Sequence, residues 1–132
     1  MEKNTEQNLA VVRERMMRLR QVREQLAEEV RLLMTHTEEE QLRWTGSVTD
    51  LMEALYCAFE QEVVTDEDGI PASFREIVRQ CCRLLHVKMP SNPYETATRG
   101  RQRKGVKNSN YLTRYQRMLE KGTHNILFLH IA

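Results

Sequence analysis

The longest feature of the hydrophobic pattern is a seam near the start of the chain. From Asn4 to Met34 there is no Gly or Pro, and apolar residues recur three and four positions apart, as on one face of a helix. The seam positions are Leu9, Val12, Met16, Leu19, Leu26, Val30 and Leu33. Only Arg23 breaks the seam. The pattern predicts a long helix whose seam pairs with a second copy in a homodimer or packs on the chain's own helices.

Capping signals predict two shorter helices in the middle of the chain. Ser47, followed by Asp50 three positions later, opens a helix that should end near Glu62. Ser73 and Glu76 have the same spacing and open the next amphipathic helix. Between these helices, residues 66–69 are predicted to form a turn that ends in a glycine.

Two more helices follow a turn with two prolines. Asn92 as N-cap and Pro93 in the first helical position start a helix that should run to Lys104, with Gly105 closing it. The fifth helix is expected to be capped by one of the residues 108–110 and to end at Gly122. The apolar tail after it is too short for a free helix, which suggests a docked strand or extended arm.

These elements predict an all-α fold, which would gain a minor two-stranded wing if residues 63–70 and the tail pair as a small sheet. A long N-terminal helix and acidic linker (1–41) precede a four-helix, helix-turn-helix-like domain (42–122) and an apolar tail (123–132). The expected core residues are Trp44, Leu51, Leu55, Tyr56, Phe59, Phe74 and Ile77.

The charge distribution is strongly uneven, although the net charge is only +1. Residues 1–86 hold 11 basic and 17 acidic residues, whereas residues 87–132 hold 9 basic residues and 2 acidic ones. A basic C-terminal third is typical of proteins that bind a polyanion. A solvated helix face with extra arginines would give the same composition.

The fourth predicted helix has a basic face that a core helix would not carry. Helix, turn and basic helix follow one another as in helix-turn-helix DNA readers. Cations neutralise the phosphates of double-stranded DNA, and the arginine fork matches guanine edges. The predicted DNA-binding residues are Arg99, Arg101, Arg103, Lys104, Lys107, Asn108, Arg114 and Arg117. This hypothesis requires that the cations between Tyr94 and Lys107 form one continuous surface that faces solvent.

Other functional classes find little support in the sequence. The polar start is unlike a secretory signal, and no apolar run approaches the length of a membrane span. An odd number of cysteines, two of them adjacent, suits a reducing compartment, so a cytoplasmic location is expected. Neither paired metal-ligand spacing nor a nucleophile or phosphate-loop motif occurs. We therefore expect no enzyme, metal, cofactor, small-molecule substrate or membrane contact.

The stretch from Leu42 to Gly122 resembles the C-terminal region of RteC proteins, regulators encoded on conjugative transposons of Bacteroides and its relatives. The most specific match is Trp44-Thr45-Gly46-Ser47. The resemblance continues through Leu51-x-x-x-Leu55-Tyr56-x-Ala58, the Gly69 turn, Tyr94 with a downstream Arg103-Lys104 pair, and Tyr111-Leu112. It implies a DNA-binding transcriptional regulator of genes for excision of a mobile element. Family members carry a further N-terminal domain, and the 126–131 tail is not a feature of the resemblance.

The alternative interpretation is a protein-interaction module that does not bind DNA directly. In that case the N-terminal seam would take a partner helix, and the basic third would meet an acidic protein surface.

Overall fold

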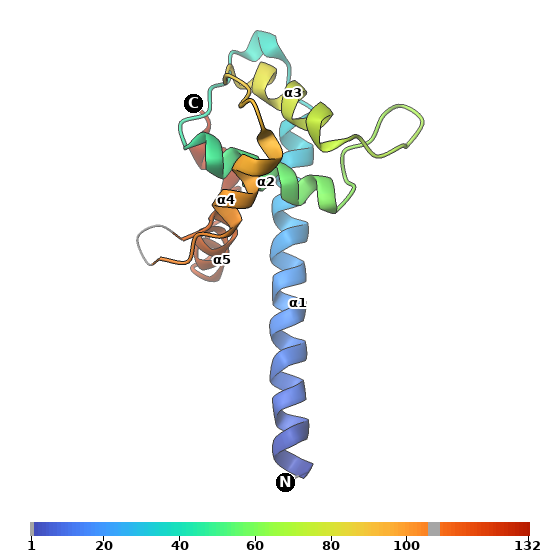
Figure 1. The fold of residues 1–132 in the computed structure, drawn as a ribbon, viewed down its shortest axis with the longest axis vertical. Coiled ribbons are helices and arrows are strands. Elements are labelled where there is room, and N and C mark those ends of the chain that lie inside the picture. Colours follow the sequence, from blue (N-terminus) through green and yellow to red (C-terminus); the bar gives the residue numbers. More distant parts are fainter. Residues whose placement is uncertain (1, 106–108) are drawn as a thin grey trace.

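The structure, a computed structural model, describes residues 2–105 and 109–132, and helices joined by loops make up this part of the chain. Its elements are α1 (Glu2–Leu33), the 3-10 turn η1 (Glu38–Glu40), α2 (Val48–Glu60), α3 (Phe74–Leu84), α4 (Pro93–Arg101), α5 (Tyr111–Glu120) and the 3-10 turn η2 (Leu127–His130). The all-α prediction is confirmed (Figure 1). No helix in the described ranges is long and apolar enough to cross a bilayer.

The second helix, α2, is the centre of the fold. It packs against α1, α3, α4 and α5, and its residues from Asp50 to Leu55 are all buried. Its sequence suits this position because apolar residues occur on nearly all sides of the helix. Of the predicted core residues, Leu51, Leu55 and Ile77 are fully buried. The four predicted aromatic core residues, Trp44, Tyr56, Phe59 and Phe74, are half-buried and pack against the core from its edge.

The first helix belongs to the core only in its C-terminal half. Leu26, Val30 and Leu33 are at most 1% exposed because α2, α5 and η2 cover them. Of the two alternatives for the seam, these three residues therefore follow the second: they pack on the chain's own helices, which contradicts their predicted place in a homodimer seam. All residues from Asn4 to Gln21 are exposed, and this half of α1 extends away from the other helices (Figure 1).

Side-chain caps fix the starts of the four shorter helices. Ser47, Ser73 and Asn92 accept hydrogen bonds from the backbone N–H three residues on, at 3.1–3.2 Å, as predicted. Asn110 is the cap of α5, with a bond of 2.8 Å. The end of α4 was predicted wrongly: the helix stops at Arg101, because the chain turns there towards α5 instead of continuing to Gly105.

The predicted wing does not form in the described residues, where only isolated β-bridges occur. Residues 64–72 make a narrow hairpin-like loop in which Ala72 N–H donates to Val64 at 2.9 Å. The tail instead pairs with the segment before α2: Arg43 and Ala132 exchange two backbone hydrogen bonds of 2.9 Å. Ile126 and Leu127 are fully buried, so the core crosses the predicted boundaries at 41/42 and 122/123.

Candidate nucleic-acid interface

The basic helix α4 is seated on α2 through its small residues. Pro93, Ala97 and Gly100 form its buried face. A Cβ atom at Gly100 would lie 2.4 Å from Glu53 Oε1 and 2.8 Å from Thr49 Cγ2, so only glycine permits this approach. The opposite face is exposed and carries Tyr94, Glu95 and Arg99. It follows that the backbone of α4 is held close to α2 while its outer face meets solvent.

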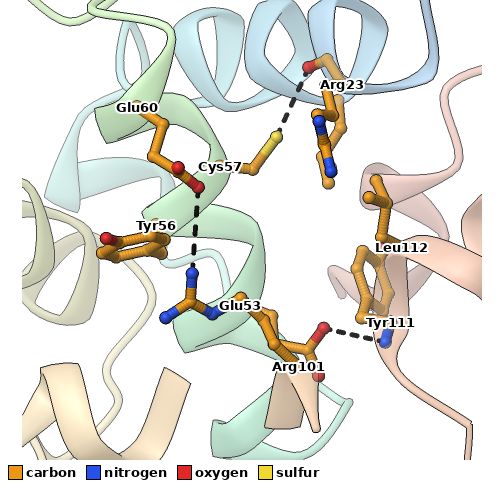
Figure 2. A pocket seen from close by; sticks show the side chains of 9 residues that line it. Arg23, Glu53, Tyr56, Cys57, Glu60, Arg101, Tyr111 and Leu112 are labelled. Carbon is orange, nitrogen blue, oxygen red and sulfur yellow. Dashed lines mark hydrogen bonds and ion pairs between the residues drawn. The ribbon is translucent and has the colours of Figure 1, made fainter. Parts of the chain in front are cut away.

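Arg101 does not lie on that outer face. Its guanidinium carbon is 4.1 Å from the centre of the Tyr56 ring, and Nη1 lies 4.0 Å from Glu60 Oε1 (Figure 2). The side chain is 37% exposed and lines a cavity of about 190 Å³ between α1, α2, α4 and α5. The prediction that Arg101 is a leading DNA contact is therefore corrected: stacking and ion pairing turn its charge towards α2.

Arg114 is also engaged within the fold. Its two terminal nitrogens donate to the carboxylate oxygens of Asp50 at 2.5 and 3.0 Å. Hydrogen bonding to Asp50 raises the pKa of Arg114. Because Asp50 is buried near the start of α2, this paired geometry ties α5 to α2. The predicted phosphate-binding role of Arg114 is wrong in this structure, since both donors face a buried acid.

The remaining predicted cations keep their charge at the surface. Arg99 is 70% exposed, with Glu95 Oε1 at 3.2 Å. Lys104 and Arg117 are exposed, Arg103 is half-buried, and none of these three has an ion pair among the described residues. Lys107 and Asn108 lie outside the described residues. Of the described cations between Tyr94 and Lys107, Arg99, Arg103 and Lys104 thus reach solvent, and Arg101 interrupts the predicted continuous surface.

A buried carboxylate fixes the junction that carries these cations. Glu53 Oε2 accepts the backbone N–H of Tyr111, the first residue of α5, at 2.9 Å. Its other oxygen lies against Gly100 and has no hydrogen-bond partner in the described part of the chain. Burial raises the pKa of Glu53 to about 7. The Gly100 turn of α4 and the start of α5 are therefore held to α2 from inside, while Lys104 between them is exposed.

The Trp44–Ser47 motif has a structural role. The indole N–H of Trp44 donates to the carbonyl of Ser47 at 2.8 Å, and the ring lies against Gly46 and His130. Ser47 then caps α2. Thr45 N–H donates to the carbonyl of His130 at 2.7 Å, so the motif docks the C-terminal tail beside the first turn of α2.

A second group of cations, on α1, was missed by the sequence reasoning. Between Arg13 and Arg23 the chain has five arginines and one acid, Glu14, which pairs with Arg18 at 2.6 Å. The signal was present but hidden, because the charge of residues 1–86 as a whole is negative. The net charge summed over one or two helical turns, instead of over residues 1–86, reveals this group of arginines.

The cysteines and other candidate ligands form no recognisable reactive centre in the described ranges. All three cysteines are buried, and burial raises the pKa of Cys57 to about 12 and that of Cys82 to about 11. Both side chains are therefore thiols at neutral pH. Within residues 2–105 and 109–132, no three His, Cys, Asp or Glu side chains gather as a metal site.

The comparisons with known proteins give one match. The protein-family description "RteC protein" matches residues 8–125, which is most of the chain. No curated protein and no solved structure matches the sequence.

Proposed function

Because the chain belongs to the RteC family, we propose that it is a DNA-binding transcriptional regulator of genes for excision or transfer of a mobile genetic element. The family match supports the regulatory role, and the exposed cations around the α4–α5 connection support DNA as the partner. The chain from residue 87 onwards has a net charge of +7, so this end attracts a polyanion.

The observation that carries the proposal is that four cations on α4, on α5 and just after α4 are accessible to solvent. Arg99 lies on the outer face of α4, Arg103 and Lys104 follow it, and Arg117 lies on α5. In Figure 1, α4 and α5 lie together on one side of the helical body. The two helices and the residues just after α4 therefore present charges that could contact phosphates, while Arg101 and Arg114 secure the helices themselves.

Titration of duplex DNA by fluorescence anisotropy at several salt concentrations tests this proposal. Each neutralised phosphate contributes about 0.9 to the slope of log K against log salt, so three or four contacts give a slope of roughly −3. Lys104→Ala and Arg117→Ala should each reduce the slope by about one unit and weaken binding to all sequences similarly.

Arg31→Ala is the matched control. Arg31 is exposed on α1, pairs with Glu28 and lies outside the proposed surface. Its removal should leave the salt slope unchanged. A wild-type slope near zero, or equal losses from Arg31→Ala and Lys104→Ala, would argue against phosphate contacts at the α4–α5 connection.

A further inference from the structure

The exposed half of α1 carries an apolar surface that the chain itself does not cover. Leu9, Val12, Met16 and Leu19 continue the core-facing stripe of α1 towards its N-terminus, and they are 37–65% exposed. Exposed apolar stripes of this kind on a rigid helix indicate a contact site. The charges that surround the stripe determine which kind of partner it fits.

The surroundings of the stripe are positively charged. Where α1 reaches the end of α2, a groove of about 580 Å³ has Met16, Met17 and Leu19 on its apolar side. Its charged lining residues are Arg13, Arg20 and Arg23. None of these three arginines has an ion pair among the described residues. An apolar floor with a purely cationic rim fits an apolar helix face with acidic borders.

A second copy of this chain fits the rim poorly. In a parallel pair, Arg15 of one copy would face Arg20 of the other. In an antiparallel pair that sets Leu9 against Leu19, the two Arg13 side chains would meet. A second antiparallel pair would bring Arg15 towards Glu29 of the other copy, but Glu29 is buried within its own chain. Like charges at such flanking positions disfavour self-pairing.

We propose that the Leu9–Leu19 face of α1 binds an amphipathic helix of a partner protein whose apolar seam is bordered by Glu or Asp. The apolar seam would bury Met16 and Leu19, and the acidic borders would pair with Arg13 and Arg20. This surface lies on α1 and does not use the cations at the α4–α5 connection, so it does not depend on the proposed DNA binding.

A pair of designed peptides tests the proposal with the full chain. Both have four heptads with Leu at the seam positions; one carries Glu at both bordering positions, and the other carries Lys. The labelled Glu peptide should bind about tenfold more tightly than the Lys peptide, because several rim pairs of a few tenths of a kcal/mol each add up. The double variant Arg13→Glu/Arg20→Glu should reverse this preference, which a purely structural role of the arginines would not do.

One seam variant and one control variant locate the site on the helix. Met16→Asp should weaken binding of the Glu peptide about tenfold, because it places a charge in the apolar contact. Gln7→Asp introduces the same charge on the same exposed half, outside the seam, and should leave binding unchanged. Circular dichroism confirms that both variants remain folded.

Several outcomes would overturn the proposal. They are equal binding of the two peptides, absence of binding, or displacement of the Glu peptide by duplex DNA. Light scattering that shows a dimer of the chain, lost on Met16→Asp, would assign the face to a second copy instead.

Discussion

The hydroxyl of Tyr115 on α5 donates a hydrogen bond to the carboxylate of Glu29 on α1, 86 residues earlier in the chain. The other carboxylate oxygen of Glu29 accepts the backbone N–H of Leu127 at 3.0 Å. Glu29 is 1% exposed, and burial raises its pKa. One acidic side chain therefore holds α5 and the tail to α1, and it is tolerated in the core because both its oxygens have donors.

Glu29→Ala should destabilise the protein by about 2–4 kcal/mol, because it leaves the buried Tyr115 hydroxyl and Leu127 N–H without an acceptor. Urea denaturation followed by circular dichroism measures the change. Glu28→Ala, one residue earlier, removes only an exposed pair with Arg31 and serves as the control. Similar midpoints for the two variants would contradict the structural role of Glu29.

The two arginines of α5 should separate stability from DNA affinity. Arg114→Ala leaves buried Asp50 without its partner and should lower the free energy of unfolding by about 1–3 kcal/mol. Arg117→Ala should leave stability nearly unchanged and weaken DNA binding, because Arg117 is exposed. Thermal melts and anisotropy titrations of both variants make the comparison. If Arg114→Ala lost affinity without losing stability, Arg114 would be a DNA contact after all.

The raised pKa of Glu53 predicts that the free energy of unfolding falls as the pH rises. Its pKa in the folded protein is about 7, against an ordinary value of 4.5, so the folded state binds more protons between these two pH values. Stability should therefore decrease from about pH 4.5 to pH 7 and then level off. Glu29, whose pKa is also raised, should add to the same trend.

Glu53→Gln should remove much of this pH dependence and stabilise the protein at pH 8 by up to about 3 kcal/mol. The amide oxygen can still accept the Tyr111 N–H. Urea midpoints measured from pH 4.5 to 8 provide the test. Glu24→Gln, an exposed change on α1, should leave the pH profile as it is. An unchanged slope in Glu53→Gln would contradict the elevated pKa.

Gly100→Ala should destabilise α4, although alanine is the better helix former by about 1 kcal/mol. The added methyl would overlap Glu53 and Thr49, and the resulting shift of α4 should cost about 1–3 kcal/mol net. Thermal denaturation shows whether Gly100→Ala lowers or raises the stability of the protein. A stabilised Gly100→Ala protein would show that α4 can move away from α2 without cost.

The sequence predicts the helices well because their signals are local. Ser47, Ser73 and Asn92 each cap the helix that they were expected to cap. The recurrence of apolar residues every three or four positions locates the buried faces of α2 and α3. The end of α4 escaped prediction because it depends on the pairing of Lys104 with Ser109, which is not visible in the helix's own residues.

The candidate site was less predictable because charge pairing is a property of the folded chain. Arg101 and Arg114 look the same as Arg99 and Arg117 in a list of cations. Their different roles come from Glu60 and Asp50, which lie more than forty residues away in the sequence. In the same way, the seam of α1 runs evenly through the sequence, but only its second half meets the other helices.

The docking of the tail against Arg43 and Glu29 implies an order for biosynthesis. Ile126 and Leu127 seal the core, and Glu29 has only one of its two donors until Leu127 arrives. During translation, α1 and α2 must therefore wait for residues 126–131 to leave the ribosome before the interior is closed. A nascent chain stalled before that point would expose an apolar surface to chaperones and proteases.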